Sequence, residues 1–124
     1  MLDLFINYDG NIDDIVKEIR ELLGIEQIKK TDEFGAVYMF RFLDIEFVLY
    51  GDHELEDDCG IAFSDYNYQL QILKLYSGEK YKSYENIYNN VATYLMEKLS
   101  YAFNSNVMLV DNLQSIVAST VPTT

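Results

Sequence analysis

The chain of 124 residues contains no tryptophan and only one cysteine, one histidine and one proline. A single cysteine excludes a disulfide bond within the chain. Zinc sites in proteins are built mainly from cysteine and histidine. With one of each in the chain, any zinc site would have to be completed by carboxylates. The scarcity of these residues argues against a disulfide scaffold and against a specific zinc centre.

Basic residues are also few, with 9 Lys and Arg against 21 Asp and Glu and a formal net charge of -12. Nucleic-acid backbones and anionic membranes attract clusters of lysine and arginine, so we expect no direct nucleic-acid or membrane partner. A charge of this sign instead favours encounter with a cationic protein. The competing interpretation is that the acidity only keeps the protein soluble.

Long apolar runs and glycine-rich loops are absent as well. The opening residues MLDLFINYDG lack the features of a secretory signal, and no apolar run approaches the length of a membrane span. We therefore expect a cytoplasmic protein. The six glycines are scattered, so there is no glycine-rich phosphate loop and we expect no cofactor.

What the chain does contain is enough apolar material for a core, with 49% hydrophobic and 15% aromatic residues. This length and composition predict a single globular domain over residues 1–124, with residues 119–124 as a loose tail. Apolar residues recur at helical spacing in residues 11–24, where Asn11 can cap the start and Gly24 the end. A second helix is predicted over residues 83–103, starting at Ser83.

The middle of the chain is rich in β-forming residues. Strands are predicted within five segments: residues 25–30, 36–43, 44–51, 60–78 (two runs) and 106–112. Turns are expected at residues 31–35 and 64–67, and residues 113–120 are predicted to form a short helix. The order predicts an α+β fold, with an antiparallel meander of four to six strands and two main amphipathic helices on one face.

The stretch GDHELEDDCG, residues 51–60, concentrates the chain's polar chemistry. Five carboxylates fall within seven residues: Asp52, Glu54, Glu56, Asp57 and Asp58. An EF-hand would need glycine and glutamate at the sixth and twelfth positions, but counting from Asp52 these are Asp57 and Phe63. We therefore expect no specific metal site.

The only histidine and the only cysteine, His53 and Cys59, lie in the same stretch and raise the question of nucleophilic catalysis. Neighbouring carboxylates disfavour a reactive thiolate, so we interpret Cys59 as a partly buried residue that begins a strand. General acid-base catalysis needs carboxylates in differing environments, whereas five in one polar loop share solvent. We expect no enzyme, and a metal-dependent enzyme is the third hypothesis.

Tyrosine is abundant, with 11 residues, and it suits binding surfaces because it offers a large contact area at low entropic cost. Tyr66 follows Asp65 in a predicted turn and is a candidate contact. Tyrosine is also a good strand former, so this choice stays open. From the residues alone, the acidic stretch is either a solvated loop or a surface that meets a cationic partner.

Residues 42–72, FLDIEFVLYGDHELEDDCGIAFSDYNYQLQI, with the capped helices on either side, resemble the small acidic immunity proteins of bacterial toxin systems, particularly those of contact-dependent growth inhibition. The resemblance lies in length, acidity and element order. It implies a cognate basic toxin domain, often a nuclease, that the immunity protein binds and neutralises. The residues predicted to contact it are Asp52, Glu54, Glu56, Asp57, Asp58, Asp65 and Tyr66. The alternative is a small intracellular regulatory domain that binds another basic protein.

Overall fold

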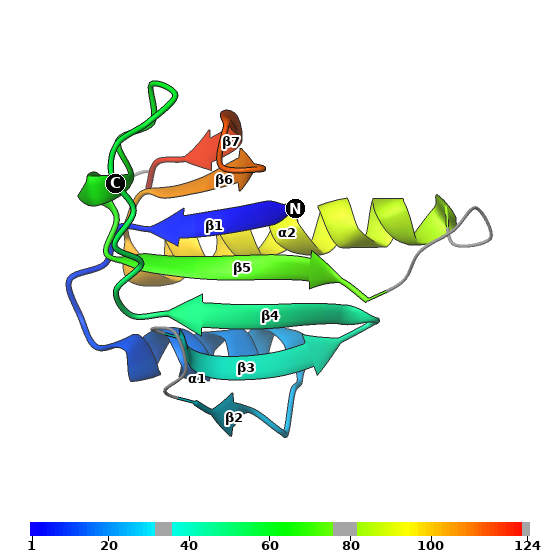
Figure 1. Ribbon diagram of the computed structural model, residues 1–124. Helices are drawn as coiled ribbons and strands as arrows, with labels where there is room; N and C mark the ends of the chain where they lie inside the picture. Colours follow the sequence, from blue (N-terminus) through cyan, green and yellow to red (C-terminus); the bar gives the residue numbers. More distant parts are fainter. Residues whose placement is uncertain (32–35, 76–81, 123–124) are drawn as a thin grey trace.

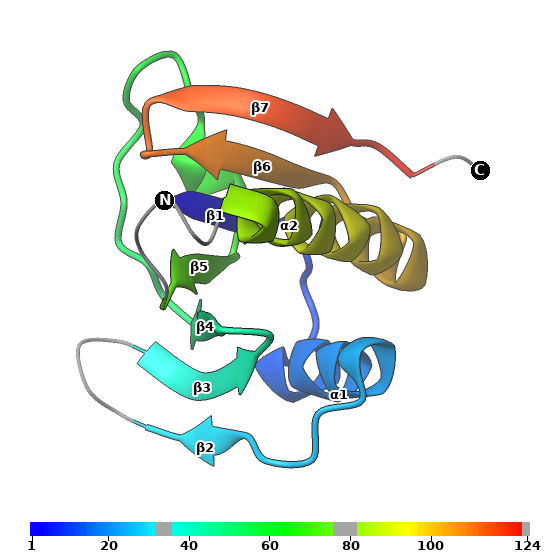
Figure 2. The same cartoon turned by 90° about the vertical axis from the view of Figure 1, so that its right-hand side faces the viewer.

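A computed structural model describes residues 1–31, 36–75 and 82–122 and has an α+β architecture (Figure 1). Seven antiparallel strands form one sheet in the order β2-β3-β4-β5-β1-β6-β7. Both helices cover the same face of this sheet (Figure 2). The elements are β1 (Leu2–Ile6), α1 (Ile12–Leu23), β2 (Lys29–Lys30), β3 (Ala36–Phe42), β4 (Ile45–Tyr50), the 3-10 helix η2 (Phe63–Asp65), β5 (Tyr68–Lys74), α2 (Lys82–Phe103), β6 (Val107–Asp111) and β7 (Ser115–Thr120).

The predicted fold class is confirmed, because the sheet is antiparallel and the two helices lie on one of its faces. The sheet has more strands than expected, and only β2 to β5 follow one another as a meander. β1 was not predicted as a strand. It lies in the middle of the sheet, between β5 and β6, and all five of its residues are buried.

The first helix ends where the sequence predicts. Asn11 Oδ1 accepts a hydrogen bond from the Asp13 amide at 2.8 Å, which satisfies a backbone donor of the first turn. Gly24 adopts a left-handed conformation with φ of 66°, and its amide donates to the Arg20 carbonyl. Ile15, Val16 and Ile19 are buried, so the predicted apolar face of α1 is the face that packs on the sheet.

The prediction of a helix at residues 113–120 is wrong, since residues 115–120 form β7 and pair with β6. Asn112 and Leu113 both have positive φ, and the Gln114 amide donates to the Asp111 carbonyl at 3.0 Å. Two successive left-handed residues make the tight turn that suits a β-hairpin. The β-branched residues that follow favour a strand. Two residues of the predicted tail, Ser119 and Thr120, therefore belong to the sheet.

Three smaller expectations also change. β2 comprises only two residues of the strand predicted at 25–30, and the first predicted run in 60–78 is replaced by a turn and η2. The apolar pattern shifts phase at Leu73 and Leu75, which suggests either a bulge or a strand covered on both faces. β5 ends at Lys74 with continuous register to both neighbours, so the described strand has no bulge. Most of the turn predicted at 31–35, and the side chain of Ser83, lie outside the described residues.

The main core lies between the helices and the sheet, and Tyr88 of α2 is its largest buried side chain. The Tyr88 hydroxyl accepts a hydrogen bond from the Leu2 amide at 2.8 Å and donates to the Ile72 carbonyl at 2.6 Å. Leu2 and Ile72 are paired across β1 and β5, so the hydroxyl joins two strands of the sheet. Among the described residues, no helix is both long and apolar enough to cross a membrane.

Removing this hydroxyl by Tyr88→Phe is expected to lower the free energy of unfolding by about 1–2 kcal/mol, because a buried amide and a buried carbonyl lose their partner. Chemical denaturation followed by circular dichroism measures the change. Tyr101→Phe is the matched control, since Tyr101 is 86% exposed and its replacement should have no effect. Equal stability of the two variants would contradict a structural role for the Tyr88 hydroxyl.

Candidate functional site

The predicted contact residues lie in the connection between β4 and β5, residues 51–67, which we call the acidic loop (Figure 1). β4 and β5 are neighbours in the sheet, but the loop does not return directly from one to the other. It crosses the face of the sheet that the helices leave uncovered and packs over β1 and β6. This path places its carboxylates on the side of the sheet opposite the main core.

A second, smaller apolar cluster anchors the loop to the sheet. Ile61 and Phe63 of the loop pack against Phe5 of β1 and against Met108 and Val110 of β6, and all five side chains are buried. The Phe5 and Phe63 rings lie 4.9 Å apart between centroids. Because these loop side chains are almost fully removed from water, they anchor the loop to the sheet at Ile61 and Phe63, while residues 54 and 56–60 stay exposed.

Three of the five clustered carboxylates help to shape the loop: Asp52, Asp57 and Asp58. Asp57 Oδ1 accepts a hydrogen bond from the Ser64 amide at 2.9 Å, and this bond lowers the pKa of Asp57. Asp52 Oδ1 accepts from the Glu54 amide at 3.1 Å, a local turn that aspartate commonly makes. Asp52 and Asp57 therefore carry a structural role beside their charge.

Residues 58–61 form a tight turn inside the loop. The Ile61 amide donates to the Asp58 carbonyl at 2.8 Å, and the two central residues, Cys59 and Gly60, have φ of 51° and 72°. Asp58 Oδ1 also accepts from the Cys59 amide at 2.8 Å. Cys59 is exposed in this turn, so the expectation of a partly buried cysteine at the start of a strand is wrong.

His53 is fully engaged by the backbone of the loop. Its Nδ1 accepts a hydrogen bond from the Leu55 amide at 2.9 Å, and its Nε2 lies 2.7 Å from the Tyr66 carbonyl. These partners require a neutral ring that is protonated on Nε2, which donates to the carbonyl. Both ring nitrogens of His53 are thus hydrogen-bonded, and the ring contacts Phe5 of β1. His53 therefore connects the start of the loop to its end at Tyr66.

The remaining carboxylates of the predicted site, Glu54, Glu56 and Asp65, are exposed. Within the described residues, the ion pairs join other groups: the N-terminal amine to Asp111, Arg41 to Glu46, and Lys74 to Glu85. None of the described lysines or arginines pairs with a carboxylate of the acidic loop. The loop therefore presents an anionic surface whose charge the described part of the chain leaves uncompensated.

Tyr66 differs from its neighbour Asp65, because it is half-buried against the apolar cluster beneath the loop. Burial, and to a smaller extent the Asp65 charge, raise the pKa of Tyr66. Its carbonyl also accepts the hydrogen bond from His53. The structure therefore gives Tyr66 an anchoring role and leaves only part of its ring for a partner.

Sequence reasoning missed a second group of carboxylates at the same end of the sheet, in the connection from β1 to α1. Asn67, the last residue of the acidic loop, donates to the Tyr8 carbonyl at 2.9 Å and to Asp9 Oδ1 at 3.4 Å. The Tyr8 hydroxyl donates to Asp14, and the hydrogen bond raises the pKa of Tyr8. Asp14 lies in the first turn of α1, and its link to the loop through Tyr8 depends on tertiary contacts.

A buried carboxylate lies next to the anchoring cluster. Asp3 of β1 has no exposed surface, and its Oδ1 accepts a hydrogen bond from Gln69 Nε2 at 2.8 Å. Its Oδ2 has no hydrogen-bond partner among the residues that the structure describes. Burial raises the pKa of Asp3 from 3.8 to about 6, against the smaller opposing effects of Gln69 and the N-terminal amine. On β4, burial of Tyr50 itself, and to a smaller extent the charge of Asp3, raise the pKa of Tyr50.

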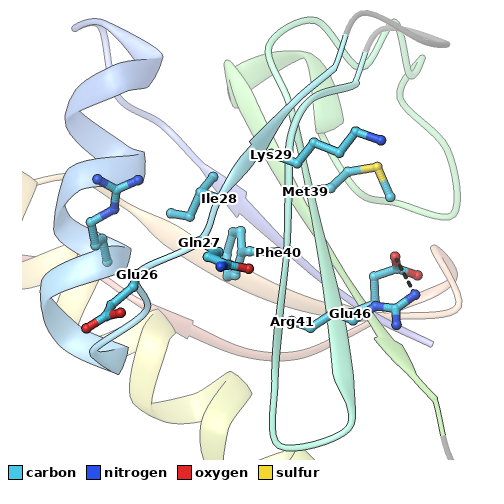
Figure 3. Close-up of a pocket in the computed structure, with 9 residues that line it drawn as sticks. Glu26, Gln27, Ile28, Lys29, Met39, Phe40, Arg41 and Glu46 are labelled. Atoms are coloured by element: carbon cyan, nitrogen blue, oxygen red, sulfur yellow. Dashed lines mark ion pairs between the residues drawn. The ribbon is translucent and has the colours of Figure 1, made fainter.

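A groove of about 660 Å³ lies at the β2 edge of the sheet, where the chain leaves α1 and approaches β3 (Figure 3). Basic and acidic side chains share its walls, and Arg41 pairs with Glu46 at 3.7 Å. Figure 3 shows Lys29 and Met39 on one side of the β2–β3 pair and Phe40 with Ile28 on the other. The groove is open and mixed in charge, and none of the predicted contact residues lines it.

The described residues contain no group of three or more His, Cys, Asp or Glu side chains arranged to hold a metal ion. Comparison of the chain with protein-family models, with curated proteins and with solved structures found no match. The functional interpretation therefore depends on the geometry of the acidic loop.

Proposed function

We propose that this chain is an immunity protein that binds a basic toxin domain through the acidic loop and so neutralises it. The observation that carries the proposal is the anchored loop whose exposed carboxylates have no cationic partner among the described residues. A toxin that acts on nucleic acid holds phosphates with lysine and arginine. An ordered set of carboxylates is a chemical counterpart to such a surface.

The anchoring cluster supports this function through preorganisation. Ordering a free loop on binding costs conformational entropy, which lowers affinity. Phe63, packed on Phe5, and His53, bonded to Tyr66, order the acidic loop before a partner arrives. The basic toxin would then meet carboxylates already held in position, and the net charge would accelerate encounter in the cytoplasm, where we place the protein.

Co-expression tests the proposal. The chain is produced together with the product of its neighbouring reading frame, expected to encode a basic toxin, and cell survival is scored. Wild type is expected to restore growth. Replacing Asp52, Glu54, Glu56, Asp57 and Asp58 together by their amides should abolish rescue. If the folded amide variant rescues as well as wild type, or if no neighbouring product is toxic, the proposal is wrong.

A further inference from the structure

The two edges of the sheet differ in how they are protected. β2, at one edge, has only two residues, and both are lysines. Short length and lysine are the devices by which natural sheets prevent a further strand from adding. β7, at the other edge, runs for six residues, SIVAST, without a charge and without a proline (Figure 1). The β2 edge thus disfavours addition of a further strand, whereas the β7 edge permits it.

The side chains of β7 are exposed to an unusual degree for apolar residues. Ile116 is 49% exposed and Val117 is 57% exposed. β7 pairs with β6 on one side only, so alternate amides and carbonyls along it face outward. The register to β6 shifts near Val117, which bends the strand. Among the described residues no further strand pairs with β7 on its outer side.

Charge indicates what pairs with this edge. The chain carries a net charge of -12, whereas residues 115–120 carry no charge, so β7 itself offers a charged segment no ion pair. A neutral, β-forming strand is the complementary partner. The same strand of a second copy meets this requirement, because antiparallel pairing of identical strands is self-complementary.

We propose that two copies of this chain pair through β7, antiparallel and about a two-fold axis between Val117 and Ala118, to form one continuous sheet. The axis stands perpendicular to the sheet, so the helices of both copies lie on the same side. The acidic loops then lie at opposite ends of the new strand pair. This arrangement limits the repulsion between two chains of net charge -12.

A groove beside the strand offers additional contact for the second copy. It has a volume of about 360 Å³ and is lined in part by Val117, by Leu109 of β6 and by Thr93 of α2. Figure 2 shows that β6 and β7 curve over α2 on this side of the sheet. In the proposed dimer Val117 lies across from Ala118 of the second copy, next to this groove.

Sedimentation velocity on the full chain, at concentrations from about 10 µM to 1 mM, tests the dimer. A single pair of strands buries less surface than a standard interface, so a dissociation constant within this range is expected. Val117→Lys brings two like charges close to the axis and should raise that constant at least about tenfold. Leu75→Lys is the control, because Leu75 is 44% exposed and lies at the end of β5, away from β7.

Hydrogen exchange of wild type gives a second measurement that needs no variant. Amides of β7 should exchange more slowly at 1 mM than at 10 µM, while those of the acidic loop should not change. A monomer throughout the range, or a dimer that survives Val117→Lys, would overturn the proposal. Loss of toxin rescue by Val117→Lys in a chain that stays monomeric would assign the edge to the toxin and also overturn it. The sedimentation measurement and the exchange of the β7 amides do not require toxin binding, so they can fail or succeed separately from the proposed function.

Discussion

Conversion of Glu54, Glu56 and Asp65 to their amides (E54Q/E56Q/D65N) is expected to weaken binding of the basic partner by at least about 100-fold. These three carboxylates are exposed, and no described hydrogen bond or ion pair engages them. Close charge pairs at a protein–protein interface can couple by about 1.5–7 kcal/mol, so loss of three of them is a large effect. Isothermal titration calorimetry with the inactivated partner measures it.

The variant is designed to change charge without changing the fold. Asp52, Asp57 and Asp58 are left intact because they hold the loop backbone, at Glu54, Ser64 and Cys59. The matched control is E21Q/E26Q/E97Q, which removes the same number of exposed carboxylates from other parts of the surface. The control should lose only a few-fold in affinity, through the weaker long-range field. Equal losses in the two variants would mean that net charge, and not the loop, determines binding.

Replacement of the buried carboxylate by Asp3→Asn is expected to raise the free energy of unfolding at pH 7 by about 2–3 kcal/mol. Burial raises the pKa of Asp3 from 3.8 to about 6, and each unit of difference corresponds to about 1.4 kcal/mol. Asparagine keeps an oxygen to accept the Gln69 hydrogen bond. Its buried amide nitrogen takes the place of the unpartnered Oδ2, which holds the gain below the full amount.

The effect of Asp3→Asn on the free energy of unfolding is expected to increase with pH. Below pH 3.8 Asp3 is neutral in both the folded and the unfolded chain, and its stabilising contribution is complete. As the pH rises through about 6 the folded chain must ionise a buried group, and the contribution is lost. The stability difference between Asp3→Asn and wild type should therefore be large at pH 7 and small at pH 4.

Urea denaturation at both pH values measures the difference, with Asp65→Asn as the control because Asp65 is exposed. The charged or titratable groups that act on Asp3 from neighbouring elements are Tyr50 and the N-terminal amine. A stability difference for Asp3→Asn that is the same at pH 4 and pH 7 would show that Asp3 has the same pKa in the folded and the unfolded chain, and would contradict the prediction.

The helix at residues 12–23 could be predicted because its determinants are local. Asn11, the apolar spacing and Gly24 lie within one short segment, and the structure uses all of them as expected. β3 and β4 were predictable for the same reason, since each consists of one short run of β-forming residues. The turn between them, at Leu43 and Asp44, was not predicted. The expected α+β class followed from these elements.

β1 could not be identified by the same means. Asp3 interrupts the apolar segment at its start, and the segment is too short to distinguish a strand from an irregular start of the chain. Its central position depends on pairing with β5 and β6, whose residues are more than sixty positions away in the sequence. β7 was mistaken for a helix because Ile116, Val117 and Ala118 fit either periodicity over so short a length.

The candidate site was predictable in composition but not in form. The carboxylates of residues 52–58 are evident in the sequence. That Asp57 helps to shape the loop while the carboxylate of Glu54 is exposed became clear only from the hydrogen bond between Asp57 and the Ser64 amide. The anchoring role of Phe63 depends on Phe5, which is distant in sequence. The nearby carboxylate of Asp14 enters only through the fold.

The most direct test of the proposed binding surface is a titration of the ¹⁵N-labelled chain with the inactivated basic partner, followed by amide chemical shifts. We predict that the largest changes fall on residues 51–67, with smaller changes at the adjoining start of α1, and that β2, β3 and the exposed face of α2 stay unchanged. Changes concentrated at the groove beside Arg41 or on α2, with the acidic loop unaffected, would contradict the account.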